Sequence, residues 1–308
     1  MSRAPGAAPT RALVTGASGF VGSWLRSHLE DMGDEVLTPA DELDVTDAAS
    51  VERALTGSCP DAVYHLAGLA HVGRSWEEPA AFFDTNAAGT LHVLDAARRC
   101  RPLPRVLVVS SAEVYGAVAA EELPLTEETP MRPVSPYAAS KAAAEMVCLQ
   151  AHLGWGLPVI RARPFNHMGP GQSPTFAVPA LAGRILAALR AGSGVLRTGN
   201  LSARRDFTDV RDVVRAYRLL MERGEPGTAY NVCSGRDVSM AEVVDQLMAI
   251  SGADLRTEPD LELMRPVDVP VIRGDASRLE ATTGWSPEVP LEESLRAVLE
   301  SLPDFVPD

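Results

Sequence analysis

The chain is poor in cysteine, and the positions of its cysteines exclude two common ways of stabilising a small fold. Cys59, Cys100, Cys148 and Cys233 are the only four in 308 residues, and they form no Cys-x-x-Cys pair or Cys/His cluster. The six histidines include no His-x-x-x-His arrangement. This spacing argues against a disulfide framework and a zinc site, and favours buried cysteines that act as small apolar residues. We therefore expect no bound metal.

Long apolar runs are also missing. No uninterrupted apolar segment approaches the roughly 20 residues that cross a bilayer. The first residues, MSRAPGAAPTR, are small and polar without an apolar core, so we expect a short disordered lead and no signal peptide. These features predict a cytoplasmic protein. No internal repeat or low-complexity tract interrupts the chain.

Basic residues are outnumbered by acidic ones. The chain has 28 Lys plus Arg against 41 Asp plus Glu, which gives a formal net charge of −13. Such a charge repels nucleic acid and anionic membrane surfaces, so we expect neither as a partner. The hydrophobic fraction of 46% is ordinary for a globular protein, and 308 residues can bury one large core or two unequal ones.

Short Val/Leu-rich runs alternate with longer amphipathic segments in the first half of the chain. The runs are typical of buried parallel strands and the longer segments of helices. The expected strands are 11–15, 35–38, 61–68, 105–111 and 157–164, and the expected helices are 20–33, 47–55 with Asp44 or Thr46 as cap, 80–100 and 136–152. This alternation predicts an α/β fold with a doubly wound parallel sheet of the Rossmann type.

The pattern changes after Pro164. A Gly/Pro-rich loop follows, then the expected helices 178–191, 210–223, 240–251 and 291–299, with one more strand near 228–233. We predict a dinucleotide-binding domain of residues 1–164 and a smaller C-terminal substrate-binding domain of residues 165–308. The strand near 228–233 can return to the first sheet.

The segment GASGFVG places three glycines, Gly16, Gly19 and Gly22, between the first strand and the first helix. Glycines at this spacing allow a tight turn and let a pyrophosphate approach the backbone. The helix start at Phe20 and Val21 supplies free N–H groups to the anion. In this context a dinucleotide site is favoured over a ligand-free turn.

The second strand usually carries an acid for the adenosine ribose or leads to an arginine for a 2′-phosphate. The segment EVLTPADELD supplies neither clearly, so the cofactor is NAD or NADP without a preference. Asp44 and Val45 either line the adenine pocket or belong to a solvated loop.

Tyr137 and Lys141 lie four residues apart, just inside a helix that Ser135 can cap and Pro136 can start, so they share one face. In many helices such a pair is only a half-buried tyrosine beside a solvated lysine. Here it follows a strand that ends in Ser110 and Ser111, where doubly wound sheets bind ligands. A cation about 4 Å from the phenol contributes up to roughly 4 kcal/mol, enough to lower the tyrosine pKa by about three units before desolvation. Lys141, helped by the positive nicotinamide ring of an oxidised cofactor, is therefore sufficient in magnitude.

With GASGFVG, HLAG, SSAEVYG and YAASK in this order, the chain resembles the extended short-chain dehydrogenase/reductases, in their nucleotide-sugar epimerase/dehydratase branch. The resemblance implies a catalytic set of Ser111, Tyr137 and Lys141. It also implies a homodimer through the helices 80–100 and 136–152. The implied cofactor contacts, besides the glycines, are Phe20, Val21, Asp44, Val45, Leu66, Ala67, Gly68, Tyr137, Lys141 and Pro164.

The segments RPFNHMGPGQ, SARRDFTDVRDVVRAY, YNVCSG and TTGWSPE resemble the GDP-4-keto-6-deoxy-D-mannose reductases and, less closely, the GDP-mannose 4,6-dehydratases. The likeness implies a GDP-linked nucleotide sugar as substrate. Asn166 would contact the sugar or its phosphate, and Arg205 and Arg265 would neutralise the diphosphate. Arginine forks suit bidentate phosphate contacts, although a solvated basic face is the ordinary interpretation of clustered arginines.

Glu113 discriminates between the reactions that the resemblance allows. In the dehydratases a glutamate here removes the C5 proton of the sugar, with threonine common where Ser111 stands. This chain has the acid with serine, and Met168 where dehydratases tend to place an acid. The leading prediction is therefore reduction of a 4-keto-6-deoxy sugar. A 4,6-dehydratase, a 4-epimerase and a non-catalytic dinucleotide sensor are the alternatives. The nucleotide base, the choice of hexose or heptose and the C4 stereochemistry stay open.

Overall fold

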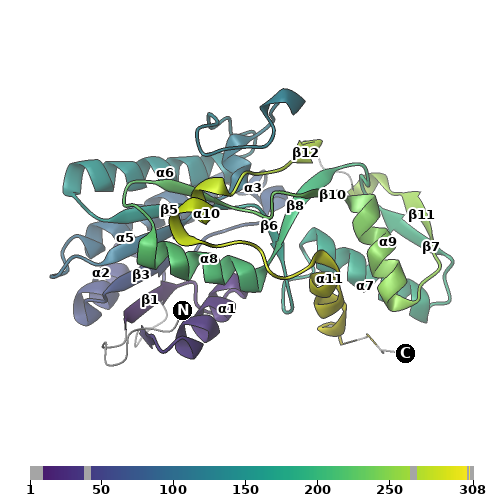
Figure 1. Ribbon diagram of the computed structural model, residues 1–308, viewed down its shortest axis with the longest axis horizontal. Helices are drawn as coiled ribbons and strands as arrows, with labels where there is room; N and C mark the ends of the chain where they lie inside the picture. The colour runs from purple at the N-terminus through teal and green to yellow at the C-terminus, as the bar shows by residue number, and fades with distance from the viewer. Residues whose placement is uncertain (1–9, 38–42, 264–268, 304, 306–308) are drawn as a thin grey trace.

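Six parallel strands form the central sheet of the computed structural model, which describes residues 10–37, 43–263, 269–303 and 305 (Figure 1). Every neighbouring pair in this sheet is parallel, which confirms the predicted α/β class. In sheet order the strands are β2 (Glu35–Leu37), β1 (Arg11–Thr15), β3 (Ala62–His65), β4 (Arg105–Val109), β5 (Val159–Pro164) and β9 (Ala229–Val232).

Helices cover both faces of this sheet. One face packs against α1 (Phe20–Asp31) and α8 (Val210–Arg223), and the other against α2 (Ala48–Ser58), α5 (Gly89–Ala97) and α6 (Pro136–Trp155). The strands β1, β3 and β4 are buried on both sides and are near-continuous apolar runs, as the sequence indicated. Their carboxyl ends meet at one edge, where such sheets bind ligands.

Two details of this half differ from the sequence prediction. The segment 80–100 is not one regular helix, because the π-helical turn Asp84–Ala88 separates α4 (Pro79–Phe83) from α5. The helix α2 is capped by Asp47, whose side chain accepts the N–H of Ala49, and not by Asp44 or Thr46. The carboxylate of Asp44 instead accepts two hydrogen bonds from Thr46.

Part of the second half returns to the central sheet. As the sequence allowed, β9 pairs with β5, and α8 and α10 (Ser277–Thr283) pack beside it. The remaining elements form the lobe at the right of Figure 1, around α7 (Ala177–Arg190), α9 (Met240–Ser251) and α11 (Leu291–Glu300). The short helix α3 (Val72–Ser75) and the 3₁₀ turns Ala112–Tyr115, Ala120–Glu122 and Leu261–Leu263 complete the described helical elements.

The sequence prediction missed the strands of this second lobe. The polar segment around Arg204 is a strand, β8, which pairs with three other strands. Its side chains form ion pairs and hydrogen bonds in place of an apolar core, so hydrophobicity did not reveal it. The additional strands are β6 (Asn166–Met168), β7 (Val195–Thr198), β8 (Arg204–Asp209), β10 (Asp237–Ser239), β11 (Arg256–Pro259) and β12 (Val271–Ile272).

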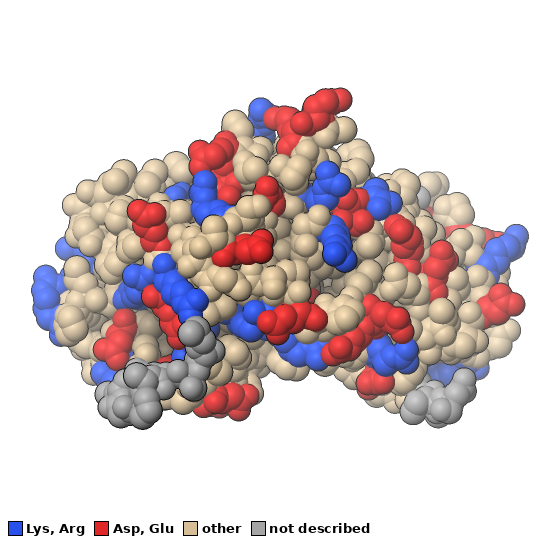
Figure 2. Space-filling model, in the orientation of Figure 1, with Lys and Arg blue, Asp and Glu red and all other residues tan. Residues whose placement is uncertain are grey.

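Surface and core agree with the composition. Cys100, Cys148 and Cys233 are buried and all four cysteines are free, as expected of small apolar residues. In the described parts of the chain, every helix is too short or too polar to cross a bilayer. On the face that Figure 2 shows, basic side chains are interspersed with acidic ones and form no broad basic region.

Candidate active site

The glycine loop GASGFVG connects β1 to α1 at the carboxyl edge of the sheet. Gly16 has a left-handed backbone with φ of +71°, and its carbonyl accepts the N–H of Gly19 at 3.0 Å. A Cβ atom on Gly22 would lie 2.0 Å from the Gly16 oxygen, and one on Gly16 would lie 2.8 Å from the nitrogen of Ala67. Larger residues at positions 16 and 22 are therefore excluded by the backbone itself.

The helix α1 begins at Phe20 with no acidic residue in its first turn. The first N–H groups of a helix have no partner within it and carry a partial positive charge. A loop in which glycines leave the backbone open, followed by such a helix start, fits the pyrophosphate of a dinucleotide. Phe20 stacks on His167, with ring centroids 6.3 Å apart, which joins this helix to the loop after β5.

Tyr137 and Lys141 lie in the first turns of α6, as predicted. Ser135 caps the helix by accepting the N–H of Ala138 at 3.1 Å. Tyr137 and Lys141 are each 7% exposed, so this is not a tyrosine with a solvated neighbour. The hydroxyl of Ser111 lies close enough to the Tyr137 phenol to lower its pKa, so the structure brings these two predicted residues together.

The lysine ammonium lies between the strand β4 and the segment HLAG. Its Nζ donates a hydrogen bond to the carbonyl oxygen of Val109 at 2.9 Å. A Cβ atom on Gly68 would lie 3.2 Å from this Nζ. The segment Leu66, Ala67 and Gly68, predicted to contact the cofactor, is therefore adjacent both to Lys141 and to the glycine loop.

The sequence predicts that Lys141, helped by the positive nicotinamide ring of an oxidised cofactor, lowers the pKa of Tyr137; the protein residues by themselves raise it. Burial is the main cause that raises the pKa of Tyr137 to about 12. The neighbouring Ser111 hydroxyl lowers this pKa, and the charge of Glu113 raises it. Burial also lowers the pKa of Lys141 to about 8. Because desolvation disfavours both charged forms, the amine loses its proton before the phenol does. The nicotinamide ring of an oxidised cofactor is the second cation on which the prediction for Tyr137 rests.

Two buried residues near the site were not predicted from the sequence, because no local motif marks their hydrogen bonds. Asn86, in the π-helical turn, holds Leu69 through both backbone groups and donates to Ser140 at 2.9 Å. The hydroxyl of Ser140 in turn donates to the Tyr137 carbonyl at 2.7 Å. Asn86 therefore ties the segment after β3 to the start of α6.

His65 is the second such residue, and its tautomer follows from its partners. Thr90 donates its hydroxyl hydrogen to the Asn86 carbonyl at 2.6 Å. Its oxygen therefore accepts a hydrogen bond from the N–H at His65 Nε2, at 3.0 Å. Thr15 accepts the N–H of Ala67, so it donates to His65 Nδ1 at 2.7 Å. Burial, with a smaller contribution from Lys141, lowers the pKa of His65 to about 3, so the ring stays neutral.

Composition contained a signal that the motif analysis did not use. Lys141 is the only lysine among 28 basic residues, and arginine stands at every other basic position. A chain that uses arginine so consistently keeps one lysine, and that lysine is 7% exposed beside Tyr137 and Gly68. The one lysine of the chain therefore lies at the predicted catalytic position.

Two of the predicted substrate residues, Asn166 and Arg205, lie on neighbouring strands of the second half. Asn166 is exposed on β6, which pairs with β8. Arg205 on β8 is buried, and its Nη1 donates to the carbonyl oxygens of Arg204 and Val269, both at 2.8 Å. Arg265 lies outside the described residues. Glu113, in the 3₁₀ turn Ala112–Tyr115, is half-buried and close enough to Tyr137 to raise its pKa.

The cofactor residues predicted beyond the glycine loop differ in their burial. Val45 is buried against Gly89, whose added Cβ would lie 2.9 Å from the valine side chain. Asp44 is exposed, and its hydrogen bonds from Thr46 hold its pKa below the ordinary value. Pro164 ends β5 and is buried at the same sheet edge as the glycine loop.

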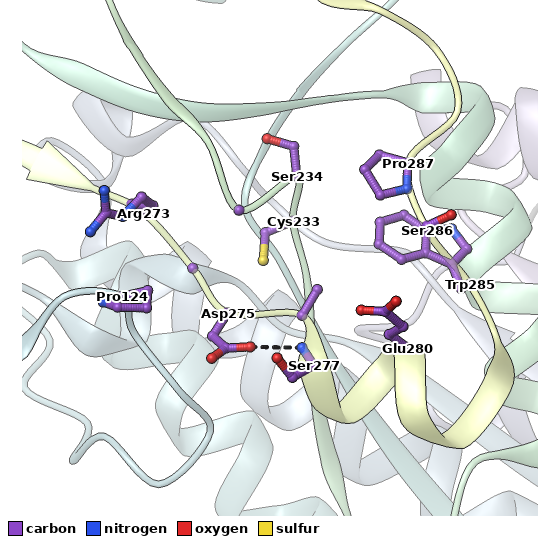
Figure 3. Close-up of a pocket in the computed structure, with 13 residues that line it drawn as sticks. Pro124, Cys233, Ser234, Arg273, Asp275, Ser277, Glu280, Trp285, Ser286 and Pro287 are labelled. Carbon is purple, nitrogen blue, oxygen red and sulfur yellow. Dashed lines mark hydrogen bonds between the residues drawn. The ribbon is translucent and has the colours of Figure 1, made fainter.

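A separate groove of about 350 Å³ lies beyond the end of β9 (Figure 3). Its walls include Ser234, Arg273 and Glu280, and none of the predicted catalytic residues lines it. Asp206 accepts hydrogen bonds from Ser234 and from Gly274 at its edge. Neighbouring side chains of a strand point to opposite faces, so Arg205 points away from this groove. Among the described residues, no group of three His, Cys, Asp or Glu side chains is arranged to hold a metal.

Comparison with known proteins places these observations in a family. The family model described as GDP-mannose 4,6 dehydratase matches residues 38–298. A GDP-6-deoxy-D-mannose reductase from Pseudomonas aeruginosa is 40% identical over 94% of this chain and 96% of its own. A dTDP-glucose 4,6-dehydratase from Streptomyces griseus is 34% identical over 94% of this chain and 93% of its own.

Solved structures agree with the sequence relatives. The structure of RMD from Pseudomonas aeruginosa complexed with NADPH superimposes with a TM-score of 0.89 at 38% identity, covering 95% of this chain and 98% of that one. A UDP-glucose 4-epimerase from Thermotoga maritima with UDP-glucose gives 0.85 at 29% identity, over 94% and 98% of the two chains. The chain therefore belongs to the GDP-mannose 4,6-dehydratase family, within the extended short-chain dehydrogenase/reductases.

Proposed function

We propose that this protein reduces the C4 keto group of a nucleotide-linked 4-keto-6-deoxy sugar, with NADPH or NADH as the reductant. The substrate of first choice is GDP-4-keto-6-deoxy-mannose, and the product is GDP-6-deoxy-mannose (GDP-rhamnose). The observation that carries this proposal is the 40% identity to the Pseudomonas reductase over nearly the whole of both chains, against 34% to the Streptomyces dehydratase.

The residues of the site fit a nicotinamide dinucleotide. Gly16, Gly19 and Gly22, with the N–H groups of Phe20 and Val21, would hold the pyrophosphate. The remaining proposed contacts are Asp44, Val45, Leu66, Ala67, Gly68, Tyr137, Lys141 and Pro164. When bound, the reduced cofactor supplies the hydride that reaches C4 of the sugar.

The protein residues then handle the oxygen at C4. Tyr137 donates its proton to this oxygen, and Ser111, whose hydroxyl is near enough to the phenol to lower its pKa, would hold the oxygen in place. Lys141 supplies a positive charge that stabilises the phenolate left behind. The amine is charged below its pKa of about 8, so this stabilisation of the phenolate is available at neutral pH and is lost above about pH 8.

The smaller lobe would supply the contacts to the nucleotide sugar. Asn166 would contact the sugar, and Arg205 and Arg265 would contact the diphosphate. In this proposal the chain divides into domains of residues 1–164 and 165–308, with β9 returned to the first domain. Arg204 and Arg211 suit this role less well, because both are paired with acids: Arg204 with Asp237 and Glu242, Arg211 with Asp209 and Glu293.

A 4,6-dehydratase is the second candidate, because Glu113 lies beside the phenol. Its charge raises the pKa of Tyr137, so a carboxylate is near the reacting atoms. In that reaction Glu113 would remove the C5 proton, and the hydride taken from C4 would return to C6. Such an enzyme regenerates its cofactor, whereas a reductase consumes one reduced cofactor per product.

The test is a spectrophotometric assay with 4-keto-6-deoxy sugars linked to GDP, dTDP or UDP. The proposal predicts loss of reduced-nicotinamide absorbance with the GDP-linked substrate, in proportion to product. Conversion of GDP-mannose without added reduced cofactor would establish the dehydratase instead. Tyr137→Phe separates an enzyme from a dinucleotide sensor: turnover should fall by at least about 100-fold while cofactor affinity stays within about twofold.

We further propose that the protein is a cytoplasmic homodimer that binds no nucleic acid or membrane. The helices α4, α5 and α6 lie together and expose Phe83, Leu91, Met146 and Leu153, which are 41%, 39%, 47% and 74% exposed. A second copy would cover this apolar face. Light scattering should give twice the mass of the chain, and replacing both Met146 and Leu153 by glutamate should give monomers.

A further inference from the structure

A fully buried carboxylate lies one helical turn beyond Lys141. Glu145 on α6 is 0% exposed, and each of its oxygens accepts two hydrogen bonds. Oε1 accepts from Ser110 at 2.6 Å and from Arg163 Nε at 2.8 Å. Oε2 accepts from Arg163 Nη2 at 2.7 Å and from Arg161 at 3.3 Å. A buried charge is tolerated only with such complete pairing, and the fork of Arg163 fixes its orientation.

The pair formed by Glu145 and Arg163 reaches both ends of the turn that carries Ser111 and Glu113. At one end, Ser110 donates to Glu145 and directly precedes Ser111. At the other, Arg163 Nη1 donates to the hydroxyl of Tyr115, the last residue of the turn, at 3.0 Å. The turn is therefore fastened to α6 on both sides of its reactive groups.

Tyr115 also fixes the far side of this network. Its hydroxyl donates to Oδ1 of Asn231 on β9 at 2.6 Å, and the guanidinium carbon of Arg163 lies 5.1 Å from its ring centroid. Arg163 itself lies on β5 and is buried. The network thus joins α6, the turn and two strands of the sheet through charged and polar groups alone.

We propose that Glu145 and Arg163 are positioning residues, which set the place of the Ser111–Glu113 turn relative to Tyr137 on α6. The proposal rests on the proposed function, because it gives Ser111 and Tyr137 a common substrate oxygen. A buried ion pair is weak evidence for stability, since apolar residues of similar volume often stabilise a fold as well or better. An ion pair with directional hydrogen bonds can fix the positions of α6 and the turn relative to each other, which apolar residues cannot do as specifically.

The test compares this pair with a second buried ion pair that lies away from the turn. Arg163→Lys keeps the charge and removes the fork, and Tyr115→Phe keeps the ring and removes one hydroxyl. The control is Arg218→Lys on α8, because Arg218 Nε donates to Asp34 at 2.9 Å and both side chains are at most 10% exposed. All three variants are compared at temperatures at which each is folded.

The first readout is kinetic. Displacement of a catalytic group by about 1 Å costs about 100-fold in rate, so Arg163→Lys and Tyr115→Phe should lower kcat by at least about 10-fold with cofactor KM unchanged. Arg218→Lys should keep the wild-type kcat. If Arg163→Lys does not fold, Tyr115→Phe decides. Equal kcat in wild type and the variants would overturn the proposal.

The second readout needs no turnover. The chain has five tyrosines, so the Cζ resonance of labelled Tyr137 is assignable by substitution. In Arg163→Lys and Tyr115→Phe it should move toward its position in Ser111→Ala, and in Arg218→Lys it should not. A wild type that reduces no nucleotide sugar refutes the proposed function, and the Tyr137 resonance then decides positioning by itself. An unmoved resonance overturns the inference.

Discussion

Replacing Lys141 by methionine should stabilise the fold while it abolishes turnover. The ammonium is 7% exposed, and its pKa falls from the ordinary 10.5 to about 8, with burial as the main cause. Below pH 8 the folded and unfolded states both carry the proton, so the folded state bears the full desolvation penalty. The lowered pKa corresponds to about 3 kcal/mol. Methionine loses the hydrogen bond to Val109, about 1 kcal/mol, so the net gain near pH 7 is about 2 kcal/mol.

The pH dependence distinguishes this origin from a general packing effect. Between pH 8 and 10.5 the unfolded state binds more protons at Lys141 than the folded state does, so wild-type stability rises with pH in this window. The advantage of Lys141→Met should therefore shrink by about 2 kcal/mol between about pH 7 and about pH 9.5. Tyr137 is present in both proteins and does not create this difference.

Two measurements check this expectation. Urea unfolding of both proteins across this pH range gives the difference in free energy of unfolding. Because Lys141 is the only lysine, Cε-labelled lysine gives a single side-chain resonance, which should titrate near pH 8. A stability difference that does not change with pH, or a midpoint near 10.5, would refute the argument that burial destabilises the ammonium.

The remaining predictions concern the glycine loop and the buried histidine. Gly22→Ala should abolish cofactor binding in a fluorescence titration, because its Cβ would lie 2.0 Å from the Gly16 oxygen; Gly57→Ala, with no atom within 4 Å, should bind normally. The pKa of His65 is about 3 in the folded state and 6.5 in the unfolded state. The free energy of unfolding of the wild type should therefore fall by about 2 kcal/mol between about pH 7 and 5. His65→Gln should show less of this loss in urea unfolding, and an equal loss would contradict it.

Much of the fold was predictable because its local signals agree with its tertiary structure. The expected helices 210–223 and 240–251 occur as α8 and α9 with these bounds, and the first strand as β1. In each, the apolar period and the terminal residues point to the same element. The Ser239 capping box at α9 is an example, since its side chain and that of Glu242 satisfy one another's backbone groups.

Elements that are stabilised by polar interactions, or by partners distant in sequence, could not be predicted from the sequence. The π-helical turn at Asn86 leaves the apolar pattern of the segment nearly unchanged, so a single helix was expected. Strand β8 is held by partners such as Asp237, 33 residues away from Arg204, and no apolar alternation marks it. The network of Glu145, Arg163 and Tyr115 likewise brings together three segments that share no local motif.

The prediction for Tyr137 depends on two positive charges, and this bears on how the site works. The sequence indicated that Lys141 and the positive nicotinamide ring of an oxidised cofactor are together sufficient in magnitude. Burial lowers the pKa of Lys141 to about 8 and raises that of Tyr137 to about 12, so the lysine alone does not make the phenol acidic. An arginine would stay charged here, yet its planar fork cannot replace a compact amine between Gly68 and the Val109 carbonyl. The site therefore combines a small, easily deprotonated amine with a phenol whose acidity requires a further positive charge. Proton transfer from Tyr137 would then depend on what is bound beside it, and a protein without ligand would keep its phenol protonated.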